Sequence, residues 1–269
     1  MRHKFVMAQT MSGDVPADNL RKAEELIGRA RAEYRADMVL FPEYFMYYYK
    51  ARTPVEEIQA SAQPLDGPFV TQMRRLAREN RVWVLFGMNE APDNGDKRIY
   101  NTMVLLDAGG EIVVTYRKSH LYDADAFRES DIYQPSDRLF TPIDTPFGRL
   151  GLMVCYELRF PEVARHQALH GAQVLLSPAA WVRADLKPMH WKVQLACRAI
   201  ENGIYVVAPN HYSPKVFLGE SIAVDPTGVI IANGTEEEDL VPCAIDLGRV
   251  EVARKKFPNL INRRPELYR

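Results

Sequence analysis

The chain has 269 residues, with 34 basic and 35 acidic side chains and a formal net charge of -1. A hydrophobic content of 47% allows a sizeable buried core and argues against disorder. The balanced charge argues against non-specific binding to nucleic acid, and no apolar run approaches the roughly 20 residues of a membrane span.

The first half of the chain alternates short β-branched runs with amphipathic stretches, which is typical of α/β proteins. Asp18 and Asn19 are expected to cap a helix, because their side chains accept hydrogen bonds from free backbone N–H groups. In chain order we expect a strand at Lys4–Ala8, a helix from that cap to about Tyr34, a strand at Met38–Phe41, a helix at Gly67–Asn80, a strand at Val82–Met88, and a hairpin of Thr102–Leu106 and Ile112–Tyr116 around Asp107–Gly110.

The second half shows the same kinds of signal. Pro161 suits the first position of a helix, and Gly203 is expected to end another. In chain order we expect a turn at Thr145–Gly148, a strand at Leu150–Cys155, a helix from Pro161 to about His170, a strand at Val174–Leu176, a helix at Pro188–Asn202, a strand at Ile204–Ala208, a hairpin of Ser221–Val224 and Val229–Ala232, and a strand at Pro242–Asp246 before a polar, basic tail.

These elements repeat one order: a helix, a strand that ends near a proline, a second helix, a second strand and a hairpin. The first copy spans roughly residues 20–117 and the second roughly 161–232. Any α/β chain shows some rhythm of this kind, but two similar halves predict two sheets packed face to face with helices outside, a four-layer α-β-β-α sandwich. No linker separates the halves, so we expect a single domain over residues 1–269.

Cysteine usage indicates a reducing environment. The three cysteines, Cys155, Cys197 and Cys243, include no Cys-x-x-Cys pair, so neither a disulfide framework nor a structural zinc site is expected. The first ten residues contain only a short apolar patch, which does not match a signal peptide. We therefore expect free thiols and a cytoplasmic location.

Three reactive side chains follow or end apolar strands, where α/β proteins gather their functional groups. They are Glu43, Lys118 and Cys155. Taken singly, they would be a solvated loop acid, a surface lysine and a small core thiol. Taken together they suggest nucleophilic catalysis, because a thiol needs a base or a nearby cation to attack at neutral pH. Glu43 could take the proton, and Lys118 could stabilise the negative charge that develops.

The segments around these residues resemble the signature segments of the nitrilase superfamily, the carbon–nitrogen hydrolases. They are FPEYF around Glu43, YRKSHLYD around Lys118 and CYELRFPE around Cys155. FRES resembles the segment that carries the family's second active-site glutamate, here Glu129. Further similarity lies in HWKVQLACRAIENGIYVVAPN, DPTG and the closing RRPELYR, so the resemblance covers nearly the whole chain. It also implies the family's αββα sandwich.

The resemblance implies covalent acyl transfer from a small amide. Glu43 would deprotonate Cys155, whose sulfur attacks the carbonyl carbon. Lys118 and the backbone N–H of Tyr156 would hold the oxyanion. Ammonia would leave, and water would hydrolyse the thioester to a carboxylate. Glu129 would orient Lys118 or the substrate amide. None of these steps requires a metal or an organic cofactor.

CYELRFPE is similar to the corresponding segment of the omega-amidase and deaminated-glutathione amidase branch, which favours a small ω-amide as substrate. Glu157 stands where that branch usually has Asp. Hydrolysis of N-carbamoyl amino acids or nitriles is the enzymatic alternative. The alternative from another class is an inert binding or signalling member of the fold. Arg159 could bind a substrate carboxylate through two hydrogen bonds, or it could form a buried ion pair with Glu157 or Glu162.

Aromatic residues close to the reactive set are expected to wall a substrate pocket. Tyr44 and Tyr49 follow Glu43 closely, and Trp181 stands at the end of a later strand. The alternative for the two tyrosines is packing at a loop or a dimer interface, and the alternative for Trp181 is packing in the core. The resemblance also implies a homodimer or a higher homo-oligomer, with a C-terminal tail of about residues 247–269 packing on the partner subunit.

Overall fold

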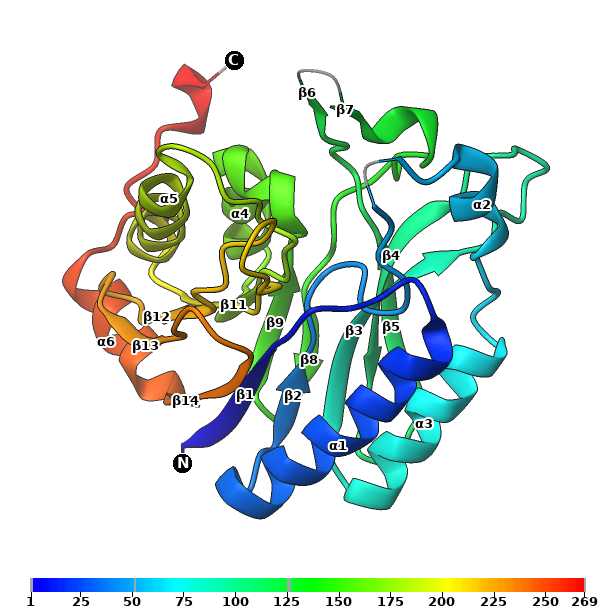
Figure 1. Cartoon of the computed structure of the whole chain (residues 1–269). Helices are drawn as coiled ribbons and strands as arrows, with labels where there is room; N and C mark the ends of the chain where they lie inside the picture. The colour runs from blue at the N-terminus through cyan, green and yellow to red at the C-terminus, as the bar shows by residue number, and fades with distance from the viewer. Residues whose placement is uncertain (1, 51, 125–126, 269) are drawn as a thin grey trace.

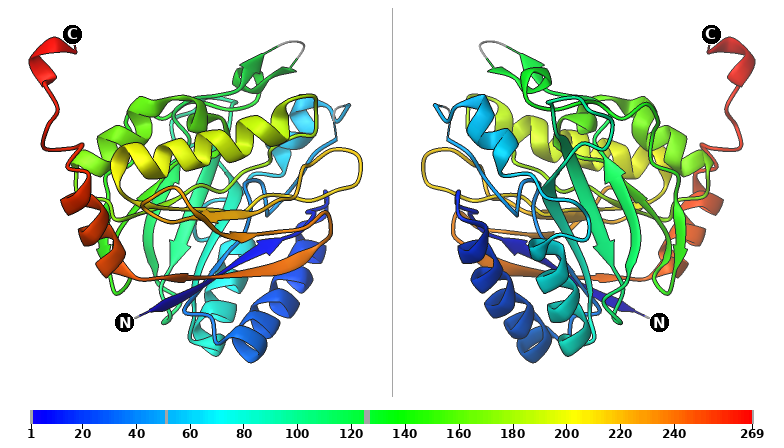
Figure 2. Two further views of the ribbon diagram at one scale, coloured as in Figure 1. Left: turned by 90° about the vertical axis from the view of Figure 1, so that its left-hand side faces the viewer. Right: turned by 90° about the vertical axis from the view of Figure 1, so that its right-hand side faces the viewer.

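The computed structural model describes residues 2–50, 52–124 and 127–268. Within these ranges two six-stranded sheets pack face to face, and helices cover both outer faces (Figures 1 and 2). The predicted α-β-β-α sandwich is therefore confirmed. Met1 and Arg269, the ends of the predicted domain, lie outside the described residues.

The first sheet comes from the first half of the chain and is completed by the last strand. Its order is β14-β1-β2-β3-β4-β5. Helices α1 (Pro16–Tyr34) and α3 (Pro68–Asn80) pack on its outer face, and the short helix α2 spans Val55–Ala60. The strands are β1 His3–Gln9, β2 Met38–Leu40, β3 Trp83–Glu90, β4 Tyr100–Leu106, β5 Ile112–Arg117 and β14 Asp239–Ile245.

The second sheet has the order β13-β12-β11-β10-β9-β8, and helices α4 (Pro161–Leu169) and α5 (Lys187–Asn202) cover it. Its strands are β8 Ile143–Thr145, β9 Gly148–Leu152, β10 Val174–Leu176, β11 Tyr205–Ala208, β12 Ile222–Val224 and β13 Ile230–Asn233. A small hairpin of β6 (Asp123–Ala124) and β7 (Phe127–Arg128) projects at the top of Figure 1.

The two sheets share one pairing scheme. From β14 to β5, and again from β8 to β13, neighbours pair antiparallel, parallel, parallel, antiparallel and antiparallel. The predicted internal repeat is therefore confirmed. The sequence pattern shows it because both copies keep the same succession of buried strands and covering helices.

Each central strand is buried on both faces, which explains its continuous apolar run. In β1, Phe5 and Met7 point between the sheets, whereas Val6 and Ala8 point toward the helices α1 and α3. This alternation has the period of two that strand geometry imposes. The molecule thus has a central apolar layer between the sheets and an outer apolar layer beneath each helix pair.

Helix α1 begins earlier than predicted. Its first residue is Pro16, and Val15 occupies the cap position, so the predicted cap at Asp18 and Asn19 is wrong. Proline suits this place because the first helical N–H needs no partner within the helix. Asn19 is buried instead, and its side chain bonds to the backbone of Gly13 and Met46.

The predicted basic tail begins with a helix, α6 (Leu247–Lys256), that packs on its own chain. Val250 and Ala253 are buried, and the Arg254 guanidinium donates to the carbonyl of Ala172 at 2.6 Å. After α6 the chain passes α5, where Asn259 Nδ2 donates to the Ile200 carbonyl at 3.4 Å, and its last described residues extend from the body of the molecule (Figure 2). The segment that is free to meet a partner subunit is therefore shorter than residues 247–269.

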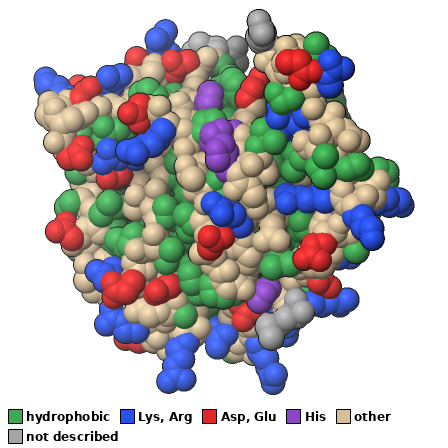
Figure 3. Space-filling view, turned by 180° about the vertical axis from the view of Figure 1, so that it is seen from behind, with side chains coloured by type: hydrophobic (Ala, Val, Ile, Leu, Met, Phe, Trp, Pro, Cys, Tyr) green, Lys and Arg blue, Asp and Glu red, His purple; other side chains and the backbone are tan. Residues whose placement is uncertain are grey.

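The surface carries no dominant charge on the face that Figure 3 shows, where acidic and basic side chains are interspersed. Across the described ranges, no helix combines the length and the apolar character needed to span a membrane.

Candidate active site

A cavity of about 600 Å³ lies between the segments that follow β2, β5, β9 and β10. Three buried charged groups and a thiol meet aromatic walls there. All nine residues that the sequence singles out line this cavity: Glu43, Tyr44, Tyr49, Lys118, Glu129, Cys155, Tyr156, Arg159 and Trp181.

The Glu43 segment lies against β3 because Gly87 has no side chain. A Cβ atom at Gly87 would lie 2.7 Å from the Tyr44 nitrogen and 3.2 Å from the Glu43 Cα. The backbone N–H of Met46 donates to the Gly87 carbonyl at 2.9 Å, which holds the segment in place. Tyr44 adopts a left-handed φ of 55°, a conformation that non-glycine residues keep only where their surroundings enforce it.

The Glu43 carboxylate is buried and held from both halves of the chain. Its Oε1 accepts hydrogen bonds from Lys118 Nζ at 2.9 Å and from Asn101 Nδ2 at 2.7 Å. Its Oε2 accepts from the backbone N–H of Ala180, which follows β10, at 3.0 Å. The alternative interpretation of Glu43 as a solvated loop acid is therefore wrong.

Lys118 directly follows β5, and its backbone N–H donates to the Asn101 carbonyl at 2.9 Å. Its Nζ lies 2.9 Å from both Glu43 Oε1 and Glu129 Oε2. Burial acts to lower the pKa of Lys118, but the charges of Glu129 and Glu43 outweigh it and hold this pKa well above its ordinary value. The ammonium is therefore permanently charged at neutral pH.

Glu129 begins a short 3₁₀ helix, Glu129–Asp131, directly after β7. Its Oε1 accepts from the Tyr44 hydroxyl at 2.6 Å, and its Oε2 accepts from the backbone N–H of Tyr122 at 2.6 Å. Asn101 Nδ2 also lies 3.2 Å from Oε1. These bonds fix the carboxylate so that it braces the Lys118 ammonium.

Cys155 does not end a strand as predicted, because β9 stops at Leu152. The residue instead begins a 3₁₀ helix, Cys155–Arg159, with a left-handed φ of 48°. Its backbone N–H donates to the carbonyl of Pro178 at 2.9 Å. The sharp turn carries the side chain out of the sheet and into the cavity.

The Cys155 thiol is protonated at rest. Burial and the Glu43 carboxylate raise the pKa of the thiol well above its ordinary value, although the Lys118 ammonium acts in the opposite direction. A hydrogen bond with the Glu43 carboxylate also favours the protonated form. The thiol therefore needs a proton acceptor at the moment of attack, and Glu43 is in place to be that acceptor.

The cavity wall combines aromatic rings with two cations. The Arg159 guanidinium lies 5.0 Å from the centre of the Trp181 ring, and Lys187 Nζ lies 5.2 Å from the same ring. The predicted alternative of an Arg159–Glu157 ion pair is wrong, because the Glu157 oxygens accept hydrogen bonds from other residues. Tyr44 lines the cavity, and its hydroxyl has a further role that was not predicted, because it holds Glu129.

Sequence reasoning missed three contributors to the site. Asn101 stands at the start of β4 and touches both carboxylates, Glu43 and Glu129. Ala180 contributes only its backbone N–H, so its side chain gives no signal. Lys187 lines the cavity from the first residue of α5, and only its closeness to Trp181 in sequence could have pointed to it.

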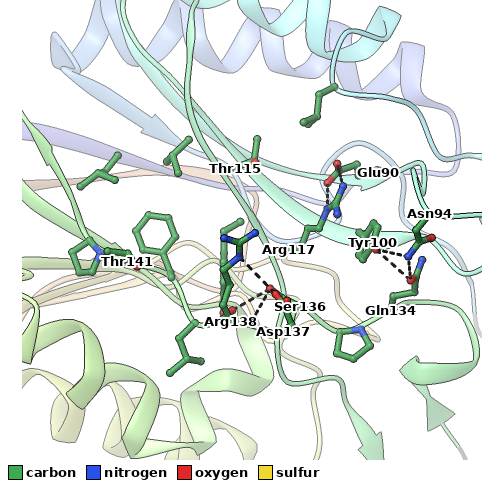
Figure 4. Close-up of a pocket in the computed structure, with 18 residues that line it drawn as sticks. Glu90, Asn94, Tyr100, Thr115, Arg117, Gln134, Ser136, Asp137, Arg138 and Thr141 are labelled. Atoms are coloured by element: carbon green, nitrogen blue, oxygen red, sulfur yellow. Dashed lines mark hydrogen bonds and ion pairs between the residues drawn. The ribbon is translucent and has the colours of Figure 1, made fainter. Parts of the chain in front are cut away.

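A second cavity, of about 790 Å³, runs along the free edge of β5 (Figure 4). It contains the Arg117–Glu90 ion pair and a hydrogen-bonded group of Tyr100, Asn94 and Gln134. It contains no cysteine, and its ion pair is already satisfied. Among the described residues, no cluster of three or more His, Cys, Asp or Glu side chains could hold a metal ion.

A comparison with known protein families matches most of this chain to one family. The model of the family described as carbon–nitrogen hydrolase matches residues 8–255. A deaminated glutathione amidase from Mus musculus is 35% identical over 274 aligned residues, which cover 97% of this chain and 83% of that protein.

Solved structures agree in fold and in chemistry. A carbon–nitrogen hydrolase from Helicobacter pylori G27 has a TM-score of 0.93 and is 25% identical, with 100% of this chain and 97% of that chain covered. A variant of the amidase from Nesterenkonia sp. AN1 has a TM-score of 0.79 and is 27% identical, with 100% and 95% covered. That structure shows covalent addition of the acetamide moiety of fluoroacetamide at the active-site cysteine.

Proposed function

The chain belongs to the carbon–nitrogen hydrolase family and is a thiol amidohydrolase, and from this premise we propose that it cleaves a small amide carrying a carboxylate. The observation that carries the proposal is one cavity holding a thiol, a buried carboxylate and a buried ammonium. We assign Cys155 as nucleophile, Glu43 as general base and Lys118 as the cation that stabilises developing negative charge.

Acylation begins when Cys155 attacks the amide carbonyl carbon and Glu43 takes the thiol proton. The carbonyl oxygen becomes an oxyanion, which the Lys118 ammonium and the backbone N–H of Tyr156 stabilise. Glu129 keeps Lys118 pointing into the cavity through their 2.9 Å contact. When the C–N bond breaks, Glu43 returns the proton to the nitrogen, and ammonia leaves.

Deacylation reverses the same proton path. Water replaces ammonia, Glu43 takes a proton from it, and the resulting hydroxide attacks the thioester carbon. The C–S bond then breaks and the sulfur regains its proton from Glu43, which leaves a carboxylic acid that loses its proton to the solvent as it is released. Both proton transfers at the sulfur pass through Glu43, so the scheme requires no cofactor.

The Arg159 guanidinium favours an anionic substrate. It lines the cavity beside the Trp181 ring, whereas the two cavity carboxylates, Glu43 and Glu129, are occupied by Lys118. A guanidinium binds a carboxylate through two parallel hydrogen bonds. A carboxylate-bearing ω-amide, such as a succinamate, offers an amide carbonyl to Cys155 and a carboxylate to Arg159.

The test is ammonia release from a panel of ω-amides, simple aliphatic amides, N-carbamoyl amino acids and nitriles. We expect release from ω-amides and none by Cys155→Ala. The Arg159→Met variant should raise KM for the ω-amide by about tenfold or more, because it loses a charge-assisted hydrogen bond. It should leave KM for an uncharged aliphatic amide unchanged. Equal effects on both substrates would contradict the assignment of Arg159.

Two further expectations belong to this proposal. We infer a homodimer through α4 and α5, because their exposed faces and the segment after α6 present large apolar side chains. These are Leu169, Met189, Val193, Ile200, Ile261, Leu267 and Tyr268. Light scattering at working concentration tests the state, and a monomer would contradict it. Three free thiols support a cytoplasmic location.

A further inference from the structure

Glu157 is a fully buried carboxylate that no step of the proposed reaction uses. It lies two residues after Cys155, within the same 3₁₀ helix. Its two oxygens face different segments of the chain, and donors occupy both of them. The carboxylate is therefore placed to join two segments rather than to meet a substrate.

Oxygen Oε1 faces the chain on both sides of Lys118. It accepts hydrogen bonds from the backbone N–H and the hydroxyl of Ser119, at 2.9 Å and 2.5 Å. It also accepts from the Tyr116 hydroxyl at 2.7 Å, and from the backbone N–H of His120 at 3.3 Å. Residues before and after Lys118 thus converge on one oxygen atom.

Oxygen Oε2 faces the turn that carries Cys155. It accepts from the backbone N–H of Val154 at 2.7 Å, and the backbone N–H of Glu157 donates to the Val154 carbonyl at 3.0 Å. These two bonds enclose Cys155, whose left-handed backbone depends on such support. Because Lys118 follows β5 and Cys155 follows β9, one side chain links the two sheets at the site.

The carboxylate is ionised, so both oxygens accept. Burial acts to raise the pKa of Glu157, but hydrogen bonds from His120, Ser119, Tyr116 and Val154 outweigh it and lower the pKa. A neutral acid would place a proton where one of these donors lies, and the link to that segment would be lost.

We propose that Glu157 is a positioning residue that sets the distance between the Lys118 ammonium and the Cys155 sulfur. This inference rests on the roles proposed for those two residues. A glutamine at this position has only one oxygen, so its NH2 group would face the hydrogen-bond donors of either the Lys118 segment or the Cys155 turn. An aspartate is one methylene shorter and would reach one segment but not both, although it keeps the charge.

The test compares Glu157→Gln and Glu157→Asp with Glu90→Gln, which removes a buried carboxylate that lines the second cavity and not the one that holds Cys155. We measure melting temperature, kcat, KM and the pH dependence of Cys155 alkylation by iodoacetamide. The glutamine variant should lower kcat by about 10- to 100-fold with KM changed less than about twofold, because misplacing reacting groups by about 1 Å has that effect. The aspartate variant should lie between it and the wild type.

The alkylation profile separates positioning from general destabilisation. Lys118 lowers the pKa of the Cys155 thiol, so a wider separation raises that pKa and moves the profile to higher pH. Glu90→Gln should lower the melting temperature and leave kcat and the profile unchanged. If Glu157→Gln is too unstable to assay, Tyr116→Phe removes one donor and should shift the profile the same way by a smaller amount.

Two outcomes would overturn the proposal. One is a folded Glu157→Gln variant with wild-type kcat and alkylation profile. The other is a fall in kcat for Glu90→Gln that matches the fall for Glu157→Gln. Failure of the proposed function has a different signature, namely ammonia release that survives Cys155→Ala. Alkylation requires no substrate, so it also tests the positioning role if the substrate belongs to another amide class.

Discussion

Two ion pairs built from adjacent residues serve different regions of this molecule. Arg117 ends β5 and pairs with Glu90 in the larger cavity, at 2.7 Å (Figure 4). Lys118 follows it and pairs with Glu43 in the smaller cavity, at 2.9 Å. The Lys118 N–H still pairs with the Asn101 carbonyl of β4, so the extended backbone continues past β5. Successive side chains of an extended chain point to opposite faces, and one step along it moves from one cavity to the other.

The two pairs differ in burial and in balance. The Arg117 and Glu90 side chains are 30% and 6% exposed, and the second acid near Arg117, Asp93, is 73% exposed. The Lys118 and Glu43 side chains are 2% and 1% exposed, and a second acid, Glu129, shares the same ammonium. The larger cavity is therefore not the candidate active site. The better criterion is several buried charged groups beside a thiol, which only the smaller of the two cavities provides.

Removing the base should have the largest effect. Glu43→Gln should lower kcat/KM by about 10²- to 10⁴-fold, the range for loss of general acid–base catalysis. Because the Glu43 carboxylate raises the pKa of Cys155, its loss should lower this pKa and move the alkylation profile to lower pH. The variant should therefore turn over slowly while its thiol alkylates faster at neutral pH. A profile that stays in place would show that Glu43 does not control the thiol.

Removing each of the two cations in turn tests directly whether only the Lys118 pair serves catalysis. Lys118→Met should lower kcat by about 10²- to 10³-fold, as expected for loss of one oxyanion donor. Arg117→Met removes a cation one residue away and should leave kcat within about twofold of the wild type. Steady-state kinetics on the best ω-amide checks both variants. Equal losses would mean that the two cavities are coupled and that Lys118 has no special role.

The sequence predicts the sandwich and the reactive set because both depend on local patterns. Apolar runs that end in a reactive residue, as at Glu43 and Lys118, identify strand and site together. The repeat is visible because each half must bury the same kind of strands beneath the same kind of helices.

What the sequence does not predict depends on contacts made across the fold. Ala180 serves the site through a backbone N–H, and any residue except proline supplies that group. The side chain of Asn101 bridges two acids that are distant in sequence. The left-handed turn at Cys155 replaces an expected strand end, because the surrounding hydrogen bonds outweigh the local strand preference.

A change that adds no charge tests whether geometry alone controls the base. Gly87→Ala places a Cβ 2.7 Å from the Tyr44 nitrogen and should push the Glu43 segment away from β3. We expect kcat to fall by about tenfold or more, since a shift near 1 Å in a reacting group has a large effect. The Gly28→Ala variant is the control, because a Cβ there meets nothing within 4 Å. Unchanged kcat in Gly87→Ala would show that the segment relaxes freely.

The smallest expected effect on activity comes from the larger cavity, where stability should change instead. Arg117→Met leaves the Glu90 carboxylate buried and partly unpaired, with the hydroxyl of Thr102 as its remaining donor at 2.6 Å. Because Arg117 is partly solvated, the cost in unfolding free energy should be about 2 kcal/mol, between the values for surface and buried pairs. For a chain of this size that corresponds to a melting temperature lower by about 4–8 °C. The double variant Arg117→Met with Glu90→Gln should recover part of this loss, because no unpaired charge then remains buried. A double variant that is less stable than either single one would mean that Glu90 holds this region through Thr102 more than through Arg117.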